Sequence, residues 1–305
     1  MEAVTSGGGR EPGGIKPASI AKRPQRPREL QDSLNHYFYH PLAWQLARGL
    51  ARTPATPNMV SVFGGLMVIA AAVAYAQPWA PWSALLGMAL HMSWHVVDGA
   101  DGDLARMTGR SSPIGEMVDG LCDYASHVVL YLVLGTLLYQ QIGWLAWLIT
   151  VAAGASHIVQ ANHVEVQRRQ YQWWVYGLPW LRHTHSSGSA TGKSGFAALV
   201  NAYLGLASGM TPHAHAIDKA VDLARDEPAR LDRIRDQVRI EAPRLLGILK
   251  ILGPNPRAIV LGLSMLAGSP LWYFLYQTVV LNLLLVGSVM MHNAAARRIA
   301  ARIQP

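Results

Sequence analysis

Three long stretches of this chain contain no lysine or arginine, and they constrain its fold more than any other feature of the sequence. They run from 53 to 105, from 111 to 167 and from 258 to 296. Each holds apolar runs close to the roughly 17 to 25 residues that a helix needs to cross the hydrocarbon core of a bilayer. Charged residues make up 14% of the chain, whereas soluble domains contain about 25%. The sequence therefore predicts an all-α integral membrane protein.

Six transmembrane helices are expected within these stretches. Their ranges are 59–77, 81–98, 119–139, 143–164, 257–269 and 271–292. The last two would form a two-span helical hairpin over 257–293, because the uncharged run is too long for one straight helix and "AGSP" at 267–270 interrupts it.

Placing the N-terminus in the cytosol puts all 26 basic residues on the cytosolic side of this topology, as the positive-inside rule requires. The prediction is a multi-pass protein of the cell membrane whose two termini and functional site are cytosolic. The apolar run at 195–210 is short, and counting it as a span would move basic residues to the outside. We therefore expect it to lie in the interface or against the bundle.

The remaining segments predict tails and surface helices. Residues 1–27 are basic and rich in Gly and Pro, which is typical of a disordered tail. The mixture of aromatic and basic residues in 28–58 favours an interfacial amphipathic helix. Residues 59–167 would then form a four-span core, followed by a helical insert over 168–256. Residues 294–305 would form a cytosolic tail.

The insert is expected to be amphipathic and to lie in the cytosol or at the interface. Pro228 and Pro243 would each start a new helical turn. Its arginines indicate a solvated face or contact with anionic lipid, and no nucleic-acid partner is expected. The apolar positions fall at steps of mostly three or four residues: Ile217, Val221, Ala224, Leu231, Ile234, Val238, Leu245 and Leu249.

Four aspartates lie where the second and third expected spans meet. Asp98 and Asp101 are three residues apart, and Asp119 and Asp123 are four apart, so on helices each pair shares one face. A loop over 103–118 is expected to bring all four carboxylates to one volume at the cytosolic surface. Packed carboxylates repel one another, and a hard cation such as Mg²⁺, Mn²⁺ or Ca²⁺ removes the repulsion. The pattern therefore predicts a site for one or two divalent ions.

Small and cationic residues separate the two aspartate pairs. Gly102 and Gly115 allow helices and a ligand to come close, and Arg106 supplies a planar cation suited to phosphate. Carboxylate-bound metal, arginine and glycine together are typical of a diphosphate site.

This region resembles the signature of the CDP-alcohol phosphotransferases (CDP-alcohol phosphatidyltransferases) at every position. The matching residues are Asp98-x-x-Asp101-Gly102-x-x-Ala105-Arg106 and, eight residues later, Gly115-x-x-x-Asp119-x-x-x-Asp123. The similarity extends over about 35–167 and includes "TPN" at 56–58.

The resemblance implies a transfer reaction in which a substituted phosphoryl group moves from a CDP-linked donor to a hydroxyl and CMP is released. It implies that Asp98, Asp101, Asp119 and Asp123 hold one or two Mg²⁺ or Mn²⁺ ions on the diphosphate. It also implies that Asp123 is the general base. The implied nucleotide- or phosphate-binding positions are Asn58, Gly102, Ala105, Arg106, Ser112 and Gly115.

Further implications concern partners. The family implies a CDP-linked lipid donor, a small polar alcohol acceptor, contact with membrane lipid and a homodimer. Asp103 falls at an unconstrained position of the signature and is expected to face solvent.

Several functions remain open at this stage. The favoured one moves a phosphatidyl group from CDP-diacylglycerol to inositol, inositol phosphate or glycerol 3-phosphate. A second moves choline or ethanolamine phosphate from the CDP-alcohol to diacylglycerol. An intramembrane prenyltransferase would also use aspartates and Mg²⁺ on a diphosphate, but with differently spaced clusters. An ion carrier would place its carboxylates along a path through the membrane.

Two clusters of polar residues lie within or beside the spans. His91, His95 and His127 are expected to be polar packing near the site. A second cluster, at the cytosolic end of the fourth span, fits either an acceptor head group or ordinary anchoring at the membrane surface. Its members are His157, Gln160, Asn162, His163, Glu165, Arg168, Arg169 and the more distant Lys193.

Overall fold

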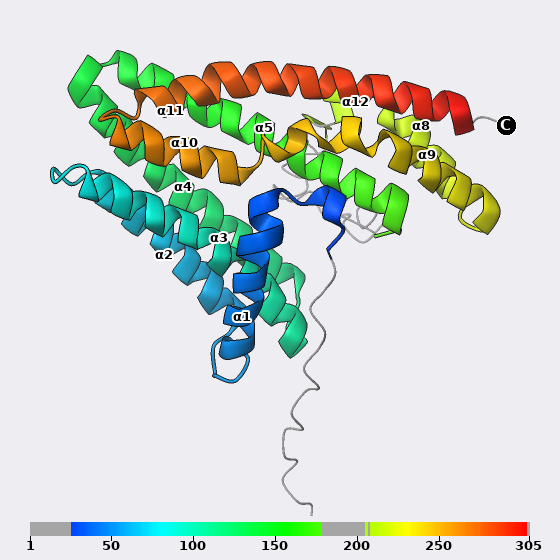
Figure 1. Cartoon of the computed structure of the whole chain (residues 1–305), viewed down its shortest axis with the longest axis horizontal. Helices are drawn as coiled ribbons and strands as arrows, with labels where there is room; N and C mark the ends of the chain where they lie inside the picture. Colours follow the sequence, from blue (N-terminus) through cyan, green and yellow to red (C-terminus); the bar gives the residue numbers. More distant parts are fainter. Residues whose placement is uncertain (1–25, 179–204, 207, 304–305) are drawn as a thin grey trace, which may run out of the picture.

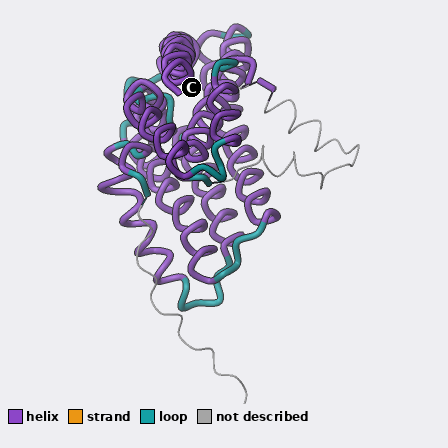
Figure 2. Tube along the Cα trace, turned by 90° about the vertical axis from the view of Figure 1, so that its right-hand side faces the viewer, coloured by secondary structure: helices purple, strands orange, loops and turns teal. Residues whose placement is uncertain are grey.

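The computed structural model describes residues 26–178, 205–206 and 208–303 of the chain (Figure 1). Nearly all of the expected tail over 1–27, most of the run at 195–210 and the insert residue Lys193 lie outside these ranges. Within them every regular element is a helix, and no strand occurs (Figure 2). The all-α prediction is therefore confirmed for the part of the chain that the structure describes.

The principal helices are α1 (His40–Leu50), α2 (Pro57–Tyr75), α3 (Trp82–Thr108), α4 (Pro113–Ile142), α5 (Leu145–Tyr176), α8 (Ala214–Leu223), α9 (Pro228–Leu246), α10 (Pro254–Leu266), α11 (Leu271–Leu275) and α12 (Leu281–Ile303). Short 3₁₀ turns occur at Arg28–Leu30 and Ile248–Lys250, and π-helical turns at Asn35–Tyr39 and Tyr276–Val280. The second π turn joins α11 to α12 without a break. The interfacial helix expected over 28–58 is shorter, because the chain turns at 51–56 before α2 begins.

Local capping signals set the helix boundaries around the site. The Thr56 side chain accepts a hydrogen bond from the main-chain N–H of Met59 at 3.3 Å, and Pro57 is the first residue of α2. Ser112 caps α4 in the same way, accepting from Gly115 N at 3.0 Å. α3 ends at Gly109, whose φ of 65° is left-handed, a conformation that favours glycine after a helix.

These caps correct the expected loop over 103–118. α3 continues to Thr108 and α4 begins at Pro113, so only residues 109–112 connect them. Polar residues near the ends of α3 and α4 do not interrupt the helices, since they face a pocket described below. The actual stop and start signals are Gly109 and the Ser112–Pro113 pair.

The N-terminal half of the molecule is a tight helical layer. α2 packs against both α3 and α4, while α1 and α10 pack against α3. Its core combines small and aliphatic side chains with aromatic ones. Ala71, Ala72, Leu134 and Leu138 are fully buried there. This packing brings the C-terminal part of α3 close to the N-terminal part of α4.

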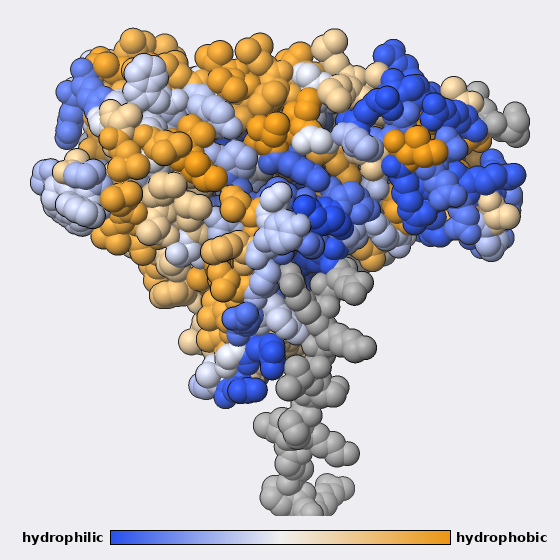
Figure 3. Space-filling view, viewed as in Figure 1, coloured by the Kyte–Doolittle hydropathy of each residue, from blue (hydrophilic) through white to orange (hydrophobic). Residues whose placement is uncertain are grey.

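Among the described residues, three helices are long and apolar enough to cross a membrane: Pro57–Tyr75, Gly115–Ile142 and the continuous helix Leu271–Ile303. Hydrophobic residues cover much of the surface over α10, α11 and the first part of α12, whereas hydrophilic residues gather around α9 and the end of α12 (Figure 3). The arrangement with six spans stays a prediction. α3 carries the buried histidines and aspartates of the site, and α10 is only 13 residues long.

The C-terminal half has its own hydrophobic core. The ends of α5 and α12 pack there against α8 and α9. Of the eight apolar positions predicted for the insert, seven are buried in this core and Leu231 packs against it. Pro228 begins α9 as predicted, but Pro243 lies inside that helix. We attribute this difference to the packing of the flanking Val238 and Leu245, which outweighs the hydrogen bond that an internal proline removes.

Glu241 joins α9 to α12. It is 1% exposed and accepts hydrogen bonds from Arg298 Nε at 3.2 Å and Nη2 at 3.0 Å, and from Arg244 Nη1 at 3.0 Å. The hydrogen bonds from Arg298 and Arg244 hold the pKa of Glu241 below its ordinary value.

Glu241→Gln should therefore destabilise the protein, because a buried site built for a carboxylate would lose charge-assisted hydrogen bonds worth about 1–3 kcal/mol. Thermal unfolding in detergent or nanodiscs measures the effect. Asp236→Asn, which changes an exposed ion pair with Arg239 on the same helix, is the matched control. Equal effects of the two substitutions would show that Glu241 does not stabilise this contact.

Candidate functional site

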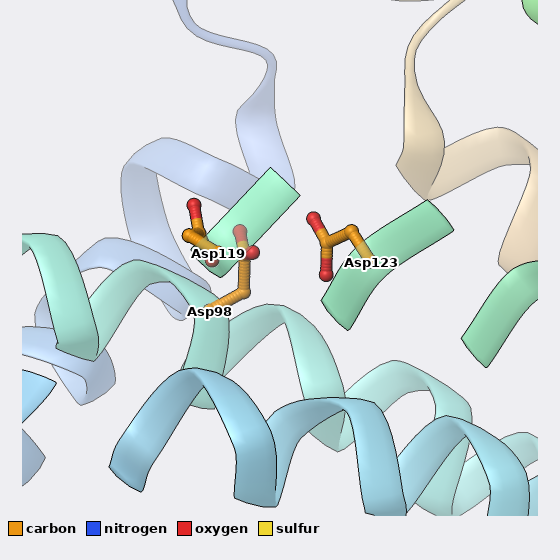
Figure 4. Close-up of side chains that lie close together, drawn as sticks. All are labelled: Asp98, Asp119 and Asp123. Carbon is orange, nitrogen blue, oxygen red and sulfur yellow. The ribbon is translucent and has the colours of Figure 1, made fainter. Parts of the chain in front are cut away.

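Three of the four predicted aspartates converge. Asp98 projects from α3, and Asp119 and Asp123 project from α4 toward the same space (Figure 4). Each offers a carboxylate oxygen, and these oxygens lie within 4.8 Å of one another. All three residues are partly buried. Their donor set consists of carboxylate oxygens alone, which fits a hard divalent cation.

The fourth aspartate, Asp101, lies one helical turn further along α3. It is 5% exposed, and Ser61 Oγ on α2 donates a hydrogen bond to its Oδ2 at 2.6 Å. The main-chain N–H of Gly102 donates to the other oxygen. Burial, and next the neighbouring Asp119 carboxylate, raise the pKa of Asp101 to about 8. Asp101 therefore extends the carboxylate group toward α2.

A pocket opens beside Asp101 and Asp119. It is lined by Pro57, Asn58, Ser61, Asp101, Gly102, Ala105, Arg106, Arg110, Ser111, Ser112, Gly115, Glu116 and Asp119. All six residues predicted to bind nucleotide or phosphate are in this lining, although they come from three helices. The structure thus brings them together next to the aspartates.

The polarity of the helices makes this pocket suitable for an anion. The first residues of α2 and of α4 both line it, and a helix N-terminus presents unpaired N–H groups and a partial positive charge. Arg106 and Arg110 add full positive charges on the α3 side. These groups favour phosphate in the pocket, and a cation held by the adjacent carboxylates would offset their repulsion of it.

Two glycines keep the pocket open. A Cβ built on Gly102 would lie 3.5 Å from both terminal nitrogens of Arg106. A Cβ on Gly115 would lie 3.2 Å from Ser112 Oγ and 3.5 Å from Asn58 Oδ1. Larger side chains at either position would fill the space between α2, α3 and α4.

Asp123 is not part of the lining of this pocket. Its side chain is within hydrogen-bonding reach of Trp94 and Asp98, and a ring nitrogen of His127 lies 2.8 Å from its main-chain oxygen. His91, His95 and His127 pack around Trp94, as expected for polar packing next to the site.

The prediction for Asp103 is wrong. Its side chain is buried, with the residue 3% exposed, instead of facing solvent. Asp103 Oδ1 accepts hydrogen bonds from Arg106 on the same helix and from Arg26 at 3.0 Å. The spacing of three residues between Asp103 and Arg106 could have indicated the first pair. The second pair joins residues 77 positions apart, and no local pattern predicts it.

Two members of the second polar cluster, Gln160 and His163, connect helices. Gln160 Oε1 accepts from Arg257 Nη2 at 3.1 Å, and Gln160 Nε2 donates to Asn282 Oδ1 at 2.7 Å. His163 Nε2 lies 3.0 Å from Ser288 Oγ. These contacts join α5 to α10 and α12, so Gln160 and His163 are committed to helix packing.

Part of the chain matches a known protein family. Residues 54–204, about half of the chain, match the family model described as CDP-alcohol phosphatidyltransferase. The match begins just before α2 and includes the pocket and all four aspartates. No curated protein matches the chain.

Mg²⁺ or Mn²⁺ should raise the melting temperature of the purified protein, because an ion among the carboxylates removes their repulsion and binds the folded state only. Asp119→Asn should reduce or abolish that shift. Glu165→Gln, which alters an exposed pair with Arg169, should keep it. A shift of unchanged size in the Asp119 variant would place the ion elsewhere.

Proposed function

Since residues 54–204 belong to the CDP-alcohol phosphatidyltransferase family, whose members are phosphotransferases, we propose that this chain moves a phosphatidyl group from CDP-diacylglycerol to the hydroxyl of a small polar acceptor. The products are a phospholipid and CMP. The observation that carries the proposal is the position of Asp101 and Asp119, which belong both to the carboxylate group and to the wall of the anion pocket.

The donor would bind with its diphosphate in the pocket. The N-termini of α2 and α4 and the guanidinium groups of Arg106 and Arg110 surround that space, and these groups stabilise phosphate charge. Asn58 and Ser112 lie at the two helix starts, where they could contact the nucleotide. Gly102, Ala105 and Gly115 leave room for the nucleotide to approach the helices.

Asp98, Asp101, Asp119 and Asp123 would hold one or two Mg²⁺ or Mn²⁺ ions. Such ions, when bound, neutralise negative charge that develops on the departing phosphate. The clustering of the carboxylates and the raised pKa of Asp101 support this assignment, since metal-free carboxylates in such an arrangement are unfavourable.

Asp123 is proposed as the general base. The acceptor oxygen forms a bond to the phosphorus next to diacylglycerol, and the bond from that phosphorus to the CMP oxygen breaks. Asp123 takes the proton from the acceptor hydroxyl. Its position across the cluster from the pocket supports this role, because the acceptor must approach the phosphorus from the side opposite to CMP.

The surroundings of the site fit a lipid substrate. Large apolar residues are more than half exposed on α2 and α12, for example Phe63, Leu66, Leu283 and Met290, and such surfaces are stable in contact with acyl chains. We propose that the chain is a multi-pass protein of the cell membrane with its termini and site in the cytosol, where the nucleotide is available. The six spans, the four-span core over 59–167 and a homodimer are parts of this proposal.

Inositol, inositol phosphate and glycerol 3-phosphate are the favoured acceptors. Purified protein should be incubated with CDP-diacylglycerol, Mg²⁺ and each alcohol, while CMP and the lipid product are measured by mass spectrometry. CDP-choline or CDP-ethanolamine with diacylglycerol, and a prenyl diphosphate, form the comparison arms. Transfer only in one of those arms would replace the proposed reaction with the corresponding alternative.

Asp123→Asn should lower kcat by about 10²–10⁴-fold, as expected when a general base is lost, while CDP still binds in the presence of Mn²⁺. Steady-state assays and CDP titration measure the two effects separately. Asp226→Asn, an exposed change far along the chain, should behave as wild type. Normal turnover by the Asp123 variant would show that another group accepts the proton.

A further inference from the structure

Arg26 reaches the end of α3 from a segment that the sequence assigns to a tail. Its Nη1 lies 2.8 Å from His40 Nδ1, and its Nη2 donates to Asp103 Oδ1 at 3.0 Å. The side chain of Gln31 donates to the main-chain oxygen of Arg26 at 2.6 Å. Both the backbone and the side chain of Arg26 are therefore fixed next to the site.

Asp103 connects Arg26 to the pocket. One oxygen of its buried carboxylate accepts from both Arg26 and Arg106. The guanidinium of Arg106 lies over Gly102 and forms part of the pocket wall. Asp103 thereby holds a flexible and half-exposed side chain in one orientation at the position proposed for the diphosphate.

Without Arg26, the ion pair between Asp103 and Arg106 would weaken the attraction of Arg106 for a diphosphate. A carboxylate bound to Arg106 cancels most of the positive charge that would attract a diphosphate, and it adds to the negative charge of the four aspartates nearby. Arg26 supplies the second cation that restores a positive balance.

Two further arginines lie near Arg26. Burial lowers the pKa of Arg26, Asp103 opposes this effect, and Arg106 and Arg168 lower the pKa further. Nε of Arg168 is buried, and no hydrogen-bond partner for it occurs among the described residues. Arg26 thus lies near two further guanidinium groups, those of Arg106 and Arg168, and shares the Asp103 carboxylate with Arg106.

We propose that Asp103 and Arg26 are positioning residues for Arg106: Asp103 fixes its guanidinium on the pocket wall, and Arg26 neutralises Asp103 so that Arg106 keeps its attraction for the diphosphate of the CDP-linked donor. The N-terminal segment thereby completes the donor site. This inference rests on the proposed function, because it assumes a donor diphosphate in the pocket.

Arg26→Gln should raise the Kd for CDP, measured with Mg²⁺, and the KM for the CDP-linked donor by about two- to fivefold, the upper part of the range for a partly exposed charge interaction. The kcat should stay within about twofold, since binding is lost equally in the ground and transition states. Arg26→Lys should recover part of the affinity. Arg28→Gln is the matched control, because Arg28 contacts the Gln31 carbonyl and the Tyr37 ring instead of the site.

A double-mutant cycle tests the role of Asp103. In Asp103→Asn there is no carboxylate for Arg26 to neutralise. Adding Arg26→Gln to that variant should therefore change the Kd for CDP by less than about twofold. Full additivity would overturn the link through Asp103. An unchanged or lower Kd in Arg26→Gln with an unchanged melting temperature would overturn the inference as a whole.

The same experiment separates this inference from the proposed function. If Arg26→Gln weakens CDP binding but wild-type protein transfers no phosphatidyl group, the proposed reaction is contradicted and the binding role of Arg26 is retained. If wild-type protein transfers the group and Arg26→Gln leaves the Kd for CDP unchanged, the proposed reaction is retained and the binding role of Arg26 is contradicted. Wild-type protein that does not bind CDP would contradict both.

Discussion

Repulsion among carboxylates at the meeting of α3 and α4 is the constraint on which the rest of the structure depends. Close helix packing enforces the arrangement, because α2 lies against both helices. A Cβ on Gly65 would be 3.4 Å from the carbonyl oxygen of Cys122 on α4, and one on Gly64 would be 3.3 Å from the Trp94 ring on α3. Small residues on α2 thus permit α3 and α4 to approach at the aspartates. Packing holds the carboxylates together, and a divalent ion would turn this unfavourable arrangement into a binding site.

The molecule provides two different environments, one for each part of the proposed lipid-linked donor. α2, α4 and the helix 271–303 expose apolar side chains along much of their length, while the pocket is lined by polar residues, glycines and helix N-termini. α5 joins the two halves, since it contacts α4 at one end and α9 at the other (Figure 1). A lipid-linked diphosphate can reach such a site with its acyl chains in an apolar environment and its nucleotide in a polar one.

Much of this arrangement follows from the sequence, and the exceptions have physical causes. The spacing of the four aspartates predicts their convergence because helix geometry depends on local sequence, and the apolar positions of the insert predict its buried face for the same reason. The prediction that Asp103 faces solvent is wrong because its partner Arg26 is distant in the chain. The prediction that Pro243 starts a new helical turn is wrong because tertiary packing outweighs the local preference of proline. Gly109 and Ser112 indicate the end of α3 and the start of α4. The expected loop over 103–118 is too long because it is based on where the apolar runs end.

The most direct test of the central claim is an experimental structure with Mn²⁺ and CDP in which anomalous scattering locates the metal. The account predicts a Mn²⁺ peak coordinated by oxygens of Asp98, Asp119 and Asp123, and the diphosphate between that ion and the start of α4. An anomalous peak remote from these carboxylates, with CDP bound outside the pocket of Arg106 and Gly115, would contradict it.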